Sequence, residues 1–183
     1  VNRMQVRDYR LRVLISREEI ANTVARLASE ISKDYRGKQP LLIGVLKGSF
    51  MFMADLIRQL DLPVEIALIR LSSYGSGTKS SGKVKVVQGL KESIKGRDVL
   101  IIEDIVDTGR TITFLLDYLR KKKPASLKLC SLTTKTSRYQ VPVSFDYLGF
   151  TLPDKFIVGY GLDLAEMFRN LPDICILEDE ESR

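Results

Sequence analysis

The chain has 183 residues, of which 44% are hydrophobic and 28% are charged, a composition typical of a globular domain rather than of a disordered segment. Its 29 basic and 23 acidic residues give a net charge of +6, which favours an anionic partner, either a phosphorylated small molecule or a nucleic acid. The sequence has no histidine, which excludes Ser-His-Asp and Cys-His catalysis and every histidine-based metal site. Acid–base chemistry must therefore come from Asp, Glu, Lys or Tyr.

The apolar segments are short. No apolar run approaches the ~20 residues that a membrane-spanning helix needs, and the arginine-containing start of the chain lacks the apolar stretch of a signal peptide. Cys130 and Cys175 each lie inside an apolar run, which predicts two buried, reduced thiols. We therefore expect a cytoplasmic protein without a membrane partner. The lysines at 121–123 follow an amphipathic segment and precede Pro124, which indicates a helix C-terminus rather than a nucleic-acid patch.

The predicted elements alternate between strands and helices. Ser16 and Glu19 form a capping box, and apolar residues follow at helical spacing until Gly37, which predicts the first helix. A buried strand is predicted over 40–46, a helix over 50–60 and a strand over 64–71, and the polar, glycine-rich residues 72–82 predict a long loop. The remaining predicted elements are strands over 83–87 and 99–102, a helix over 110–120, and strands over 127–133, 147–150, 156–158 and 174–177.

No internal repeat or linker interrupts this alternation. The pattern predicts one α/β domain over residues 1–183, with a mostly parallel central sheet flanked by helices. Ligands of such sheets bind at the carboxyl ends of the strands. Polar residues that directly follow a predicted strand are therefore the first candidates for a functional site.

The strongest chemical signal lies at one of those strand ends, in residues 99–111, where an apolar strand leads into acids, a turn of small residues and a helix. The acids are Glu103, Asp104 and Asp107, and the turn that follows contains Thr108, Gly109, Arg110 and Thr111. Backbone N–H groups and hydroxyls at such a helix N-terminus form a receptor for one phosphate group. The adjacent acids would repel a phosphate unless they face hydroxyls or a bound cation. A ribose 5-phosphate with magnesium satisfies both requirements.

An apolar strand followed by acids also describes a Walker B segment. That interpretation needs a partner Gly-x-x-x-x-Gly-Lys-[Ser/Thr] loop. The nearest match separates Gly77 from Lys79 by Thr78, and Ser72 stands where the first glycine belongs. The sequence therefore excludes a P-loop.

Residues 99–111 resemble the phosphoribosyl-diphosphate binding signature of type I phosphoribosyltransferases. Three further stretches resemble the hypoxanthine-guanine branch of that family: residues 46–48, residues 72–74, and residues 153–163 with Phe168 and Arg169 behind them. The resemblance covers nearly the whole chain. It implies the type I phosphoribosyltransferase fold, with a small hood formed by the terminal segments. It also implies transfer of 5-phosphoribosyl from phosphoribosyl diphosphate to hypoxanthine or guanine, which gives IMP or GMP and pyrophosphate.

The resemblance also implies a role for each matching residue. Asp107 is similar to the family's general base near N7 of the purine, beside the ribose and phosphate contacts of residues 103–111. The other implied roles are pyrophosphate binding by Lys47, Gly48 and Arg169, purine binding by Lys135, Phe156, Ile157, Val158 and Asp163, magnesium binding by Glu103, Asp104 and Asp163, and a lid headed by Ser73 and Tyr74. Residues 164–167 differ from the more aromatic or polar stretch of many members.

Two other functions remain open from the sequence. One is an RNA-binding regulator on the same fold, which the positive charge permits; retention of Asp107, Lys47 and the purine segment argues against it, because a pure binder needs no base. The other is a phosphoribosyltransferase for xanthine, adenine or a pyrimidine. The expected cofactor is Mg²⁺, and the expected partners are small-molecule substrates rather than nucleic acid. Because members of the family usually form homodimers or homotetramers, the resemblance also implies such an assembly.

Overall fold

The computed structural model describes residues 9–74 and 83–179 of the chain. The helices are α1 (Arg17–Asp34), α2 (Phe50–Ile57) and α3 (Arg110–Arg120), with a short 3₁₀ turn at Thr136–Arg138. The strands are β1 (Tyr9–Ile15), β2 (Leu41–Leu46), β3 (Glu65–Tyr74), β4 (Lys83–Gln88), β5 (Asp98–Val106), β6 (Ser126–Thr134), β7 (Tyr147–Thr151), β8 (Ile157–Val158) and β9 (Ile174–Asp179).

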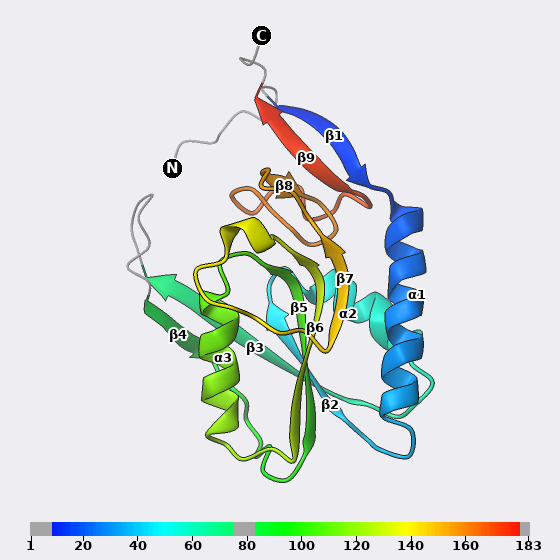
Figure 1. Ribbon diagram of the computed structural model, residues 1–183, viewed down its shortest axis with the longest axis vertical. Helices are drawn as coiled ribbons and strands as arrows, with labels where there is room; N and C mark the ends of the chain where they lie inside the picture. Colours follow the sequence, from blue (N-terminus) through cyan, green and yellow to red (C-terminus); the bar gives the residue numbers. More distant parts are fainter. Residues whose placement is uncertain (1–8, 75–82, 180–183) are drawn as a thin grey trace.

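A six-stranded sheet forms the centre of the structure, in the order β4-β3-β2-β5-β6-β7. Only the pairing of β3 with β4 is antiparallel, so the predicted mostly parallel α/β sheet is confirmed. Side chains along β2 alternate between the two faces. Leu42 packs with α1 and α2, whereas Leu41 and Ile43 pack with α3. The sheet is therefore covered by helices on both faces, as Figure 1 shows.

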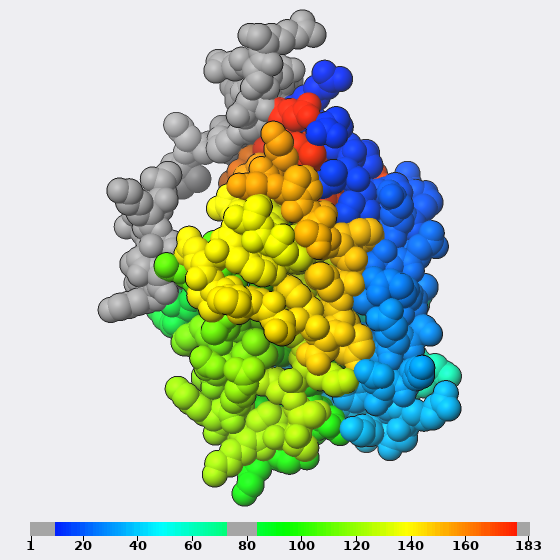
Figure 2. Space-filling view, viewed as in Figure 1, coloured from blue at the N-terminus to red at the C-terminus, as the bar shows by residue number. Residues whose placement is uncertain are grey.

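A second, antiparallel sheet joins the two ends of the chain. Its order is β1-β9-β8, with Val13 opposite Cys175 and Ile157 opposite Ile176. This small sheet lies beyond the carboxyl ends of the central strands, at the top of Figure 1. It confirms the hood of terminal segments. Helix α1 connects the hood to the central sheet and packs beside β7, where the two form one continuous surface (Figure 2).

Local sequence signals located most elements within a few residues. The Ser16–Glu19 capping box is formed, but α1 ends at Asp34, and Gly37 (φ 75°) lies in the turn beyond it. Helix α2 ends at Ile57, earlier than expected. Strand β5 runs to Val106 rather than to residue 102, because β6 continues to pair with it along this length. The two acids at 103 and 104 therefore lie within the strand.

The structure also places the two cysteines, the lysines at 121–123 and the apolar segments. Cys130 and Cys175 are buried and unpaired, as the sequence predicted. Helix α3 ends at Arg120 and is capped by Lys121, which confirms that the lysines at 121–123 mark a helix C-terminus. Across residues 9–74 and 83–179, the helices are too short or too polar to span a membrane.

Candidate active site

In the turn between β5 and α3, the backbone of Gly109 lies close to the backbone of Val141. Gly109 is the N-cap of α3, has φ 81° and supplies no side-chain cap. A Cβ at this position would overlap the carbonyl oxygen of Val141, so only glycine fits. The first N–H groups of a helix have no partner inside it. Residues 103–109 and Thr111 line a cavity of about 340 Å³ together with residues of β2 and β3. This arrangement suits a phosphate at the start of α3.

Two adjacent carboxyl groups lie buried beside that turn. Glu103 and Asp104 are each only 7% exposed. Burial, followed by the neighbouring Asp104 charge, raises the pKa of Glu103, and burial raises the pKa of Asp104. Among the described residues, no lysine or arginine forms an ion pair with either group. Buried carboxylates of this kind are stable as anions only with hydroxyl donors or a cation.

The donor set suits magnesium held together with a substrate. Mg²⁺ prefers oxygen ligands and usually binds through one or two carboxylates plus substrate phosphates and water. Within the described part of the chain, no three acidic or cysteine side chains converge to hold a metal ion by themselves. Asp163 lies with Arg169 rather than with the pair of acids, its Oδ1 2.8 Å from Nη2 of that arginine. The residues therefore fit an ion that the substrate helps to hold.

Asp107 follows β5 and faces a basic residue that the sequence did not single out. Its Oδ1 lies 2.8 Å from Nε of Arg138, in an orientation that forms an ion pair but no aligned hydrogen bond. Arg138 also lies 3.1 Å from Asp154 Oδ1, so it links the candidate base to the purine segment. Asp107 is half-exposed and can still accept a proton from a bound molecule.

Lys135 lies next to Asp107 because β6 ends beside β5. Its backbone N–H donates to Val106, and its Nζ donates to the carbonyl of Lys155 at 2.7 Å. The side chain is 7% exposed, and burial lowers the pKa of its ammonium, an effect that the charge of Asp107 opposes. The contact with residue 155 brings the purine segment to the same place. Lys135 therefore presents a desolvated donor at the carboxyl end of the sheet.

The purine segment combines an exposed ring with a buried strand. Phe156 is 51% exposed, although its position before an apolar pair would suggest a core residue. Ile157 and Val158 are buried in β8 and pair with β9. The hood therefore holds the backbone of this segment and leaves the aromatic ring accessible. An accessible ring of this kind is a stacking surface for a planar base.

The loop after β2 lies between the acid pair and the segment at residues 159–169. The peptide between Leu46 and Lys47 is cis. A Cβ on Gly48 would overlap the carboxylate of Asp104, and a Cβ on Gly161 would overlap the carbonyl oxygen of Gly48. Gly48 therefore lets the loop backbone approach the Asp104 carboxylate, and Gly161 permits a close contact between two backbones. This contact places Lys47 beside the candidate pyrophosphate residues.

Glu166, which the sequence did not single out, connects those residues. Its Oε2 lies 2.9 Å from Nζ of Lys47 and 3.2 Å from Nη2 of Arg169. These two hydrogen bonds lower the pKa of the Glu166 carboxyl. Arg169 also donates from Nη1 to the carbonyl of Gly161 at 2.7 Å. No local pattern separates Glu166 from an ordinary surface glutamate, because its contact with Lys47 spans 119 positions.

Ser73 and Tyr74 are the last residues of β3, where they pair with the start of β4. Residues 75–82, which make up most of the predicted lid, lie outside the described residues. The lid therefore stays a prediction. The structure describes only Ser73 and Tyr74 of it, in β3, which lies between β4 and β2.

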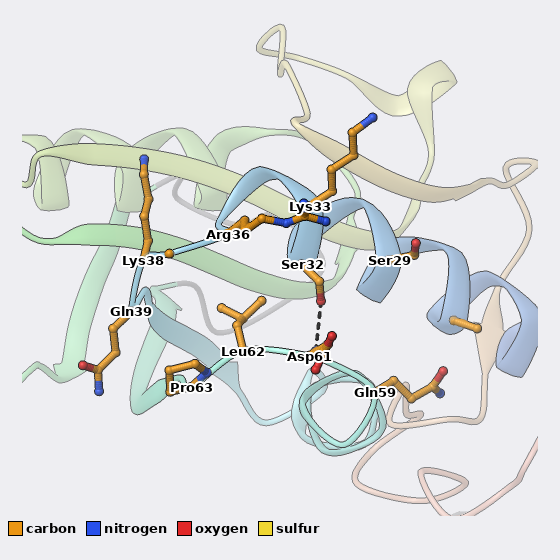
Figure 3. A pocket seen from close by; sticks show the side chains of 12 residues that line it. Ser29, Ser32, Lys33, Arg36, Lys38, Gln39, Gln59, Asp61, Leu62 and Pro63 are labelled. Atoms are coloured by element: carbon orange, nitrogen blue, oxygen red, sulfur yellow. Dashed lines mark hydrogen bonds between the residues drawn. The ribbon is translucent and has the colours of Figure 1, made fainter.

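A larger hollow, of about 1000 Å³, lies elsewhere, between the second half of α1 and the residues that follow α2 (Figure 3). Figure 3 shows a basic rim of Lys33, Arg36 and Lys38, and the hydrogen bond from the backbone of Asp61 to Ser32. This hollow contains none of the candidate site residues and adjoins the amino ends of β2 and β3. Because ligands of parallel sheets bind at the carboxyl ends, the smaller cavity at residues 103–112 is the better candidate.

The fold and the site together define a type I phosphoribosyltransferase. Residues 15–164 match the family model described as a phosphoribosyl transferase domain, so the chain belongs to this family. Individual relatives with high sequence identity show to which branch of the family the chain belongs. The chain is 47% identical over 167 residues to the hypoxanthine-guanine phosphoribosyltransferase of Bacillus subtilis, covering 91% of this chain and 93% of that protein. It therefore belongs to the hypoxanthine-guanine phosphoribosyltransferase family.

Other relatives agree with this assignment. The hypoxanthine-guanine phosphoribosyltransferase of Aquifex aeolicus is 44% identical over 176 residues, which are 96% of this chain and 99% of that protein. A crystal structure of a hypoxanthine phosphoribosyltransferase from Staphylococcus aureus has a TM-score of 0.87 at 42% identity and covers 91% of both chains. The chain is also 47% identical to the bifunctional protein TilS/HprT of Listeria innocua, but it spans only 26% of that protein's length.

Proposed function

We propose that this protein transfers 5-phosphoribosyl from phosphoribosyl diphosphate to hypoxanthine or guanine, giving IMP or GMP and pyrophosphate, as a cytoplasmic purine salvage enzyme. The observation that carries the proposal is the meeting, at one edge of the sheet, of a phosphate-binding turn, a buried acid pair and a desolvated lysine beside Asp107. A nucleoside monophosphate has one matching group for each: a phosphate for the turn, a diol for the acids and a base for the lysine. Residues 1–183 act as one phosphoribosyltransferase domain in this proposal.

The phosphate and ribose occupy the end of β5 and the start of α3. Residues 108–111 donate to the 5-phosphate, and the carboxylates of Glu103 and Asp104 accept from the ribose hydroxyls. This pairing relieves the cost of keeping two anions buried. The substrate therefore adds hydroxyl donors to two buried acids that form no ion pair among the described residues.

The purine lies between Phe156 and the end of β6. Lys135 donates to the 6-oxo group, the ring of Phe156 stacks on the base, and backbone groups of Ile157 and Val158 contact its edge. Asp107 takes the proton from N7 as N9, the purine nitrogen that bonds to the sugar, attacks C1 of the ribose. Its negative charge also stabilises positive charge that develops on the sugar ring.

The leaving pyrophosphate lies on Lys47, the backbone of Gly48 and Arg169. Glu103 and Asp104 would hold Mg²⁺ together with substrate oxygens, and Asp163, which lies with Arg169 apart from that pair, would be a ligand for a second ion. The metal would supply positive charge to the pyrophosphate group. Ser73 and Tyr74 begin a lid that excludes water from the reacting sugar. Without that exclusion, water would capture the activated ribose.

A homodimer or homotetramer fits the exposed apolar side chains of β3 and β4. Ile66 and Leu68 lie on the α2 side of β3 and are largely exposed, as are Val87 in β4 and Phe50 at the start of α2. Exposed apolar side chains gathered in one region are typical of an interface. Analytical ultracentrifugation of the full chain tests this part of the proposal.

One assay tests the proposed activity. The full chain is incubated with phosphoribosyl diphosphate and Mg²⁺, and each base is offered in turn: hypoxanthine, guanine, xanthine, adenine and uracil. We expect rapid nucleotide formation from hypoxanthine and guanine alone. Rapid turnover of another base, or salt-dependent RNA binding without turnover of any base, would contradict the proposal.

A further inference from the structure

The two cations assigned to pyrophosphate are already bridged by one carboxylate. Oε2 of Glu166 accepts from both Lys47 and Arg169, at 2.9 and 3.2 Å. These cations come from opposite sides of the site, one from the loop after β2 and one from the segment before β9. One oxygen therefore lies between an ammonium and a guanidinium, the two groups that the proposed function gives to pyrophosphate. Glu166 itself belongs to no helix or strand, and its side chain is 62% exposed.

The turn that holds Glu166 is unfavourable for its residues. Leu164 and Met167 exchange backbone hydrogen bonds, so Ala165 and Glu166 form the tip of a two-residue hairpin. Both tip residues have positive φ, 48° and 71°, a geometry that favours Asn and Gly. Residues with a Cβ are strained in this region, and such strain persists where the surroundings hold it. The ion pairs of Glu166 are contacts that can hold this turn in place.

Glu166 is also an incomplete partner for Arg169. It accepts from Nη2 only, while the buried Nε of Arg169 has no hydrogen-bond partner in the structure. Lys47 keeps nearly half of its side chain exposed. A ligand with several anionic oxygens offers more acceptors to the same two cations than one carboxylate does. Glu166 is therefore suited to be displaced by such a ligand.

We propose that Glu166 is an internal competitor of pyrophosphate. In the free protein it neutralises Lys47 and, together with Asp163, Arg169, and it must leave both cations when the diphosphate group of a substrate binds. This inference rests on the proposed function of the site. The competition weakens binding of phosphoribosyl diphosphate and of product pyrophosphate alike. It therefore assists the departure of pyrophosphate after the reaction, when the carboxylate returns to the two cations.

The test measures the dissociation constant of inorganic pyrophosphate with Mg²⁺, by calorimetry on the full chain. The Glu166 carboxylate is largely exposed, although Arg169 is only 19% exposed, so water screens both ion pairs. Breaking them corresponds to roughly three- to tenfold in such a constant, so Glu166→Gln should bind pyrophosphate tighter by about that factor. Glu166→Asp keeps the negative charge but is too short to bridge both cations, and should also bind tighter than the unmodified protein. Equal binding by Glu166→Asp and the unmodified protein would overturn the proposal in favour of a general field effect.

Glu30→Gln is the matched control. It removes one negative charge from another exposed ion pair, with Arg26 at 2.8 Å, on α1 and away from the site. Pyrophosphate binding by this variant should equal that of the unmodified protein. Weaker or unchanged binding by Glu166→Gln would mean that Glu166 positions the cations or does nothing to them, and either result overturns the inference. Turnover of hypoxanthine by the unmodified protein tests the proposed function independently. If this protein neither binds pyrophosphate nor converts hypoxanthine, the proposed function fails as well.

Discussion

Replacement of Lys135 by methionine is the sharpest test of how the protein selects its base. The change keeps an unbranched side chain of similar length and removes the ammonium. In the structure that ammonium is almost fully buried and donates to the carbonyl of Lys155 at 2.7 Å. Burial already lowers its pKa, so the charge has lost much of its hydration before any base arrives.

The size of the effect follows from the contact that is made only with the base. A hydrogen bond from a charged donor to the 6-oxo group contributes about 1.5–3 kcal/mol. Its loss lowers kcat/KM by a factor of about 10–10². Adenine has an amino group at position 6, so the lysine meets a second donor. The unmodified protein should therefore reject adenine by about 10⁴.

The assay is kcat/KM for hypoxanthine, guanine and adenine, with phosphoribosyl diphosphate and Mg²⁺ in excess. Lys135→Met should lose activity on both oxopurines and narrow the gap to adenine. Lys128→Met is the control, because Lys128 lies in β6, the strand that leads to Lys135, and is also partly buried, but bonds to Asp34 and Tyr147 near the other end of the sheet. If adenine competes with hypoxanthine in the unmodified protein, the role given to Lys135 is wrong.

Three further changes test the acids of the site. Asp107→Asn should lower kcat by roughly 10²–10⁴ with little change in IMP affinity; near-normal turnover would remove it from the mechanism. Chelation should abolish activity until Mg²⁺ is restored, and Asp163→Ala should raise the magnesium requirement, whereas turnover in excess chelator would contradict both metal roles. Burial raises the pKa of Glu103 in the folded protein above the pKa in the unfolded chain. The stability that Glu103 contributes is therefore fully present below the unfolded pKa and is lost as pH rises through the folded pKa. Glu103→Gln should therefore raise the Tm of the ligand-free protein at pH 8 and hardly change it at pH 4; equal Tm gains at both pH values would show that its charge is not the cause.

Local patterns explain what the sequence predicted well. The strand, turn and helix at residues 98–120 follow directly from an apolar run, a turn of small residues and an amphipathic segment. The start of α1 follows from the Ser16–Glu19 pair. In each case the determining contacts lie within a few positions of one another, so a single pass along the chain reveals them.

Contacts between distant segments explain what was missed. Strand β1 was not predicted, although its apolar residues alternate with arginines as in a half-buried strand. Its only partner strand among the described residues is β9, at the other end of the chain. Arg138 and Glu166 are unremarkable charges until the fold brings them to Asp107 and Lys47. Neither has a spacing or a neighbour that marks it in the sequence. The family resemblance supplied the residues that match its motifs, and these two lie outside the matched stretches or in the part that departs from them.

The features that make the carboxyl edge of the sheet chemically useful also make it costly for folding. Two buried carboxyl groups, a desolvated lysine and left-handed residues such as Tyr160, Ala165 and Phe168 all lie there. Buried charge and left-handed backbone each raise the free energy of the folded chain. The stability that tolerates them comes from the two apolar clusters on either face of the sheet, which contain no candidate catalytic residue. Because the acids, the lysine and the free donor on Arg169 all gain partners from a phosphorylated sugar with magnesium and a purine, substrate binding should compensate where packing does not.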